Sequence, residues 1–194
     1  MRVLVVGHSQ VPRVTAGFDG HEVEWCRLGG ADLRDVETVN ARLGRALTSH
    51  RDIIFLFLGG NDIFRYSKSE NTKNLRDTIH RFRALCSLLY VIKIEQRDYR
   101  NSPNPSWRAR WQYYQTECNR LNNLIKRHQR TYGFRTINLG SHNFQGRNRD
   151  GVHLNVVGRN LLYVKIKLAV KHRVEELAAK AAADAAAVAA IGNV

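Results

Sequence analysis

The sequence lacks several features, and each absence narrows the kind of protein it can be. Cysteine is scarce: Cys26, Cys86 and Cys118 are odd in number, and no two of them have the spacing of metal ligands. This usage favours a reducing compartment over a disulfide framework, so we expect an intracellular protein, cytoplasmic or nuclear. No apolar run is long enough to span a bilayer, no charged stretch leads into a cleavage site near the N-terminus, and no internal repeat occurs.

Acidic residues are also few, 17 against 31 Lys and Arg, which gives a net charge of +14. The excess is concentrated in residues 65–135, with 16 basic and 5 acidic side chains. Such a positive field attracts polyanions, so one interpretation gives this segment a nucleic-acid or anionic-membrane partner. In this interpretation the basic side chains of the segment form one face of the protein. The arginines expected on that face are Arg81, Arg83, Arg97, Arg100, Arg108 and Arg110. The alternative is a solvated basic face that aids solubility.

What the sequence does contain is an alternation of strand-like and helix-like patterns. Strands are predicted at 1–6, 21–25, 53–58, 88–94 and 134–139, and helices at 31–50, 72–85, 107–130 and 155–179. Strands that alternate with helices of this length predict a parallel sheet covered on both faces. We therefore expect an α/β protein, a three-layer α/β/α sandwich with about five parallel strands, over residues 1–177. The Ala-rich residues 178–194 are predicted to be an extension of the last helix or a linker.

Three short motifs lie far apart in this pattern. Ser9 directly follows the first predicted strand, and Asn61 in Gly-Gly-Asn-Asp directly follows the third. Asp150 and His153, in Asp-Gly-Val-His, follow the last strand after a polar loop. Because ligands bind at the carboxyl ends of strands in such sheets, we expect these residues to meet at one edge.

With these residues the chain resembles the SGNH hydrolases, the GDSL-like esterase family. The letters stand for Ser, Gly, Asn and His in separate sequence blocks. The matching positions are Ser9, Gly30, Asn61 and, in an Asp-x-x-His block, Asp150 and His153. The resemblance covers the chain from about residue 3 to residue 170 and implies a sheet of flavodoxin-like strand order.

Two details qualify this match. Gly30 is preferred over Gly29 for the second block because a small residue and a predicted helix follow it. His8 stands where the family usually has an Asp before the nucleophile. The basic middle of the chain also gives it some similarity to esterase domains of non-LTR retrotransposons, which would make it part of a larger polyprotein.

The resemblance implies a serine esterase site. Ser9 would be the nucleophile, His153 its base and Asp150 the group that orients the imidazole. The backbone amides of Ser9 and Gly30 and the side-chain amide of Asn61 would form the oxyanion hole. The expected substrate is a small carboxylic ester, most simply an acetyl ester, and no metal or organic cofactor is implied.

Two other functions remain open at this point. One is a nucleic-acid- or membrane-associated module that keeps the fold with an idle site, whose binding would weaken steeply with salt. The other is a carbohydrate O-deacetylase, which shares the mechanism and differs in substrate. The sequence does not specify the oligomeric state.

Overall fold

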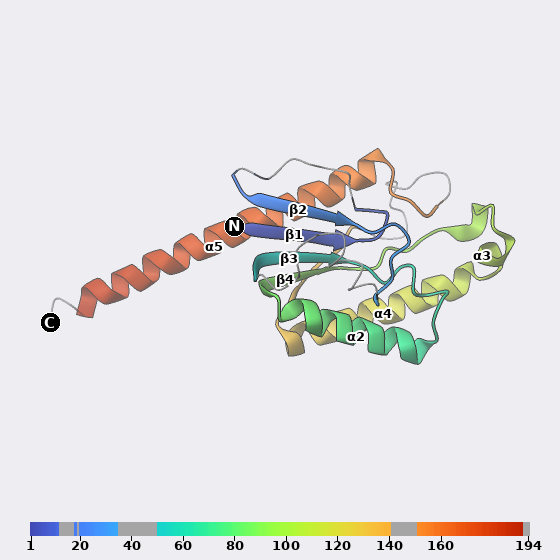
Figure 1. Cartoon of the computed structure of the whole chain (residues 1–194), viewed down its shortest axis with the longest axis horizontal. Helices are drawn as coiled ribbons and strands as arrows, with labels where there is room; N and C mark the ends of the chain where they lie inside the picture. Colours follow the sequence, from blue (N-terminus) through green and yellow to red (C-terminus); the bar gives the residue numbers. More distant parts are fainter. Residues whose placement is uncertain (12–17, 19, 35–49, 141–150, 192–194) are drawn as a thin grey trace.

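The computed structural model describes residues 1–11, 18, 20–34, 50–140 and 151–191. Among these residues, five strands form one all-parallel sheet in the order β2-β1-β3-β4-β5. The strands are β1 (Arg2–Gly7), β2 (Glu22–Arg27), β3 (Arg51–Phe57), β4 (Cys86–Ile92) and β5 (Arg135–Ile137). The number, direction and order of the strands confirm the predicted flavodoxin-like sheet (Figure 1).

Helices cover both faces of this sheet. The helices that cover them are α2 (Lys68–Arg83), α4 (Trp111–Tyr132) and α5 (Val156–Ile191). The short 3-10 helix η1 (Tyr99–Asn101) and α3 (Pro105–Ala109) lie between β4 and α4 in the chain. α2 and α4 lie on one face and α5 on the other (Figure 1). This arrangement confirms the predicted three-layer sandwich.

Alternate residues of the central strands build two separate cores. Leu56 of β3 packs in a cluster with Ile79 of α2 and Leu121 of α4. Its neighbour Phe55 points the other way and packs in a second cluster with Ile166 of α5. Because both faces of the sheet are buried, the central strands appear in the sequence as continuous apolar runs.

α2 begins four residues before the predicted start at Thr72, because Ser67 and Glu70 form a capping box. The backbone amide of Glu70 donates to Ser67 Oγ at 3.3 Å, and the amide of Ser67 donates to Glu70 Oε2 at 2.9 Å. The Ser-x-x-Glu pattern that produces this cap is present in the sequence. Capping chemistry, rather than apolar spacing, therefore determines where this helix begins.

The single helix predicted over 107–130 is wrong, since the chain breaks at Arg110. Arg110 has φ −108° and ψ 10°, outside the helical range, and separates α3 from α4. α3 is capped by Asn104, whose side chain accepts from the amide of Ser106 at 3.0 Å. The break gives α3 a direction of its own at the carboxyl end of the sheet (Figure 1).

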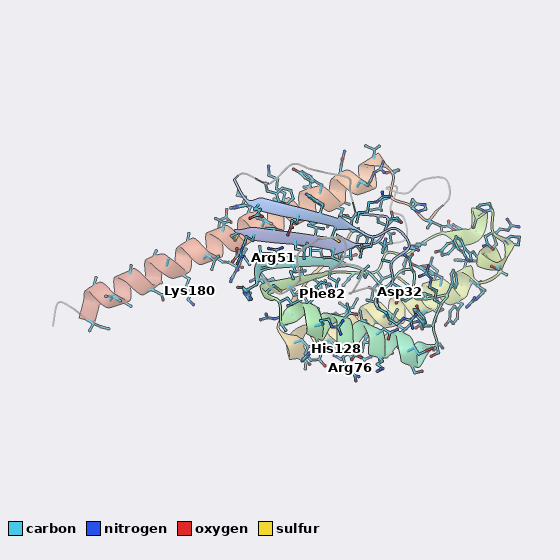
Figure 2. The ribbon with its side chains drawn as sticks, in the orientation of Figure 1. Asp32, Arg51, Arg76, Phe82, His128 and Lys180 are labelled. Atoms are coloured by element: carbon cyan, nitrogen blue, oxygen red, sulfur yellow. The ribbon has the colours of Figure 1, made fainter. Side chains whose placement is uncertain are left out.

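The predictions for the first and the last helix also differ from the structure. Residues 31–34 are described and form no helix, so the helix predicted from Ala31 does not begin there, and 35–49 lie outside the described residues. α5 continues past the predicted end at Ala179 to Ile191, which makes residues 178–191 helical. This last part, with Lys180, extends beyond the sheet (Figure 2). Within the described ranges, no helix is both long and apolar enough to cross a membrane.

The arginines of residues 65–135 do not form the single face that the sequence suggested. Arg97 is buried, with 4% of its surface exposed. Arg81 lies in the last turn of α2, near the start of β4, whereas Arg100 and Arg110 lie around η1 and α3 at the opposite end of the sheet. A nucleic-acid or membrane partner for this segment stays a prediction.

Candidate functional site

A cavity of about 680 Å³ opens at the carboxyl edge of the sheet. Ser9, Gly30, Asn61 and His153 all line it, so residues from all three motifs and from the Gly30 turn meet there. Ser9 follows β1 and Asn61 follows β3, the two neighbouring strands at which the strand order reverses. Such a switch point is where open α/β sheets bind ligands. Asp150 lies outside the described residues.

Ser9 is held in a tight turn at the end of β1. The amide of Val11 donates to the carbonyl of His8 at 3.1 Å, which closes a four-residue turn with Ser9 inside it. The amide of His8 donates to the carbonyl of Phe57 at 3.2 Å and ties the turn to β3. The turn leaves Ser9 half-buried at the cavity wall.

His8 supports this turn as a neutral, buried side chain. Its ring packs on Phe57 with centroids 4.7 Å apart, and its Nδ1 accepts a hydrogen bond from the amide of Gln10 at 3.3 Å. Burial, and then the positive charge of Arg97, lower the pKa of His8 well below its usual value. The imidazole therefore keeps the lone pair with which it accepts this bond.

Gln10 fastens the His153 segment to the Ser9 turn. Its side-chain Nε2 donates to the carbonyl of Val152 at 2.6 Å, and its Oε1 accepts from the amide of Leu154 at 2.6 Å. These two backbone groups flank His153 on either side. Gln10 is 2% exposed, and both of its bonds span more than 140 residues of sequence. Sequence reasoning missed this role, because nothing in the local pattern indicates so distant a partner.

The Gly30 turn is held by the loop after β3. Asn61 Nδ2 donates to the carbonyl of Ala31 at 2.7 Å, and Asp62 Oδ1 accepts from the amide of Leu33 at 3.0 Å. Gly30 has φ +74°, a left-handed conformation that glycine adopts readily. Among the residues that the structure describes, none accepts a hydrogen bond from the amides of Ser9 or Gly30. Both amides are thus available to a group in the cavity.

Arg97 fixes which way the Asn61 amide points. Its Nη1 donates to Asn61 Oδ1 at 3.1 Å and to the Tyr99 hydroxyl at 3.2 Å. A guanidinium only donates, so the Asn61 oxygen must face Arg97 and its NH₂ group must face Ala31 and the cavity. A Cβ on Gly60 would lie 2.7 Å from Arg97 Nη2, so glycine is needed there for Arg97 to reach Asn61. Arg97 is a second residue that sequence reasoning did not connect with the site.

The sequence that forms this site also matches a known protein family. Residues 6–161 match the model described as the GDSL-like Lipase/Acylhydrolase family. The chain belongs to this family. The membership confirms the resemblance that Ser9, Gly30, Asn61, Asp150 and His153 suggested, while the likeness to retrotransposon domains stays a side prediction.

Solved structures with the same fold include several hydrolases. A lipase/acylhydrolase from Enterococcus faecalis has 16% identity and a TM-score of 0.66, with 89% of this chain and 96% of that chain covered. An aryl esterase from M. smegmatis has 15% identity and a TM-score of 0.65, with 88% and 98% covered. Est24, a carbohydrate acetylesterase from Sinorhizobium meliloti, has 14% identity and a TM-score of 0.64, with 88% and 98% covered. A search of curated protein sequences found no match.

In this GDSL-like hydrolase, Asp62 makes the free energy of unfolding depend on pH. Burial, helped by the nearby charge of Asp32, raises the pKa of Asp62 to about 7. Unfolding returns the carboxyl to an ordinary pKa near 4. Between about pH 4 and 7 the folded chain therefore holds a proton that the unfolded chain releases, and stability falls as the pH rises through this window. Above pH 7 the loss is complete, on the order of 4 kcal/mol.

Asp62→Asn is expected to remove this pH dependence. An Asn keeps an oxygen acceptor for the amide of Leu33 and carries no charge, so the variant should be more stable than the wild type at pH 8. The gain should be about 1–3 kcal/mol, because the new buried NH₂ group has a cost of its own. Urea unfolding at pH 5, 6, 7 and 8 measures it. Parallel pH profiles for the two proteins would contradict the prediction.

Proposed function

We propose that this protein is a serine esterase that hydrolyses small carboxylic esters, most simply acetyl esters. The observation that carries the proposal is the meeting of Ser9, Gly30, Asn61 and His153 around one cavity at the switch point of the sheet. Membership in the GDSL-like lipase/acylhydrolase family supports a hydrolase. A similar structure named as a carbohydrate acetylesterase is consistent with acetyl esters, and another named as an aryl esterase is consistent with an esterase.

The proposed reaction proceeds through an acyl-enzyme. His153 takes the proton of the Ser9 hydroxyl as Ser9 Oγ attacks the ester carbonyl carbon. The carbonyl oxygen becomes an oxyanion, which accepts from the amides of Ser9 and Gly30 and from the Asn61 NH₂ group. His153 then gives its proton to the departing alcohol. Water, deprotonated by His153, then attacks the acyl-Ser9 ester, and His153 returns this proton to Ser9 Oγ as the bond to the acyl carbon breaks and the acid leaves. In this scheme Asp150 orients His153, as the Asp-x-x-His block implies.

Covalent labelling tests the proposal directly. A fluorophosphonate should react with Ser9 Oγ, lose fluoride and leave a stable phosphonyl-Ser9 that peptide mass spectrometry locates. Ser106 also lines the cavity and is the matched control position. Exclusive labelling at Ser9, absent from Ser9→Ala, supports the proposal. Labelling at Ser106, or at no serine while the folded protein still hydrolyses esters, would contradict it.

Gln10 provides a test of positioning rather than of chemistry. Gln10→Met removes both bonds to the backbone around His153 and keeps a side chain of similar length. We expect kcat for p-nitrophenyl acetate to fall about 10- to 100-fold, since small misplacements of a catalytic group cost rates of this size. KM should change little, because Gln10 does not line the cavity.

The matched control for Gln10 is Gln96→Met. Gln96 also makes a side-chain hydrogen bond, to Asn119 at 2.6 Å, but the two residues do not line the cavity. This variant should keep kcat within about twofold of the wild type. An equal loss of kcat in both variants, or a rise of KM alone in Gln10→Met, would refute the positioning role.

A further inference from the structure

Among the residues that the structure describes, the charged side chains that line the cavity are all basic. Arg65, Arg97 and Arg110 all contribute to its wall, and none of the described residues that line it is an Asp or a Glu. Low-dielectric walls concentrate such a field and attract anionic ligands. The charge of this site therefore restricts the kind of ester that it favours.

Two of these arginines form ion pairs with carboxylates that do not themselves line the cavity. Arg65 Nη1 lies 3.3 Å from Asp32 Oδ2 and also donates to the carbonyl of Gly30 at 3.0 Å. Asp32 lies at this end of the sheet in Figure 2. Arg97 Nε lies 3.7 Å from Glu95 Oε1, and its guanidinium is engaged by Asn61 and Tyr99. These two arginines are part of the scaffold of the cavity.

Arg110 is different. Among the ion pairs that the described residues form, none involves Arg110. Its guanidinium carbon lies 4.8 Å from the ring centroid of Phe64 and 5.4 Å from that of Tyr113. Two aromatic faces thus hold the side chain in place while its charge remains unbalanced, and a preorganised guanidinium loses less entropy when it binds an anion.

An aromatic surface lies beside this charge. Trp107 lines the cavity and is 39% exposed, although large apolar side chains are usually more deeply buried. Its ring is stacked on Phe64 at 6.5 Å and meets Tyr99 edge-on at 5.4 Å. The indole is therefore fixed with one part open to the cavity, as suits a surface that receives a ring.

We propose that the favoured substrates are esters in which a ring bears an acidic group, a carboxylate, sulfate or phosphate. The acidic group binds Arg110 and the ring packs against Trp107. This inference rests on the proposed esterase function and specifies its substrate class. The break in the helix at Arg110 is what brings both residues to the cavity.

The test compares two esters that differ in charge. 3- and 4-acetoxybenzoate carry a carboxylate on a phenyl ring, and their methyl esters are the neutral partners. For each protein, kcat/KM of the anionic ester is divided by kcat/KM of the neutral ester. Comparing this ratio between the wild type and Arg110→Gln cancels the difference in intrinsic reactivity of the two esters. We expect this ratio to fall about tenfold or more in Arg110→Gln, as a charged hydrogen bond is lost. In the wild type, raising NaCl should lower the rate of the anionic ester selectively.

Arg81→Gln is the matched control, since it removes the same charge from an exposed position on α2, outside the cavity. Its ratio should equal that of the wild type. Equal ratios in Arg110→Gln and the wild type for both positional isomers would overturn the inference, as would an equal fall in Arg81→Gln. Hydrolysis of the neutral ester that depends on Ser9 would then leave the esterase proposal standing, whereas hydrolysis unaffected by Ser9→Ala would refute that proposal itself.

Discussion

Ser9→Ala is expected to lower kcat for p-nitrophenyl acetate by roughly 10⁴- to 10⁶-fold, the range seen when a serine nucleophile is removed. The methyl group of alanine cannot attack the ester, so no acyl-enzyme forms. The residual rate should come from substrate binding and from the oxyanion donors, which the substitution leaves in place. The measurement is steady-state hydrolysis, with a chain-length series of p-nitrophenyl esters to define the acyl pocket.

The fold should be unaffected by Ser9→Ala. Ser9 is half-buried and its neighbours Gly7, His8 and Gln10 supply the contacts of the turn, so the melting temperature should change by no more than about 2 °C. Ser106→Ala, at the other side of the same cavity, should keep kcat within about threefold. If Ser9→Ala retains a tenth of the wild-type rate, the serine mechanism is wrong.

Asn61→Asp is expected to lower kcat about 100- to 1,000-fold, the usual cost of losing one oxyanion donor. The substitution preserves shape, and the carboxylate still accepts from Arg97, which donates to the oxygen of Asn61 at 3.1 Å. What it removes is the NH₂ group, one hydrogen of which is bound to the carbonyl of Ala31 while the other can serve an oxyanion. The new negative charge also repels the developing oxyanion, which adds to the loss.

Comparison of kcat with KM distinguishes this role from a structural one. A donor used only in the transition state lowers kcat and kcat/KM together and leaves KM nearly unchanged. Asn119→Asp adds the same charge on α4, away from the cavity, and should leave kcat within about twofold. A full rate in Asn61→Asp would exclude Asn61 as an oxyanion donor.

A residue of the site could be predicted from the sequence where its position along the chain, directly after a strand, places it at the edge of the sheet. Ser9 and Asn61 each directly follow a buried strand, and in a parallel sheet every such position falls on the same edge. Gln10 and Arg97 could not be assigned in this way. Gln10 binds backbone groups of Val152 and Leu154, and Arg97 binds Asn61. The residue type does not indicate which backbone groups a distant side chain will bind. The sequence also does not distinguish a buried arginine from an exposed one.

The errors in the predicted fold also arise where contacts between distant residues, rather than local patterns, decide the structure. The apolar spacing of Trp111, Cys118 and Leu121 continues the pattern from Trp107, so periodicity alone predicts one helix across Arg110. The chain breaks there because the side chains of α3 pack on η1 and on the cavity wall instead of on the sheet. The arginines of residues 65–135 were likewise grouped by their nearness in sequence, whereas the length of β4 separates Arg81 from Arg100 and Arg110.

By itself the sequence determined the layered α/β architecture, the parallel strand order, the family and the motif positions at one edge. The architecture and the common edge follow from local features, namely strand-length apolar runs, helical periodicity and polar residues placed directly after strands. The family and its strand order follow from the resemblance of the motifs. Only the tertiary structure decided which side chains hold the motifs together, which arginine is left unbalanced at the cavity, and that Trp107 opens into it. Those outcomes depend on contacts between residues far apart in the chain, and the free energies of such contacts are set by burial and geometry that no local pattern encodes.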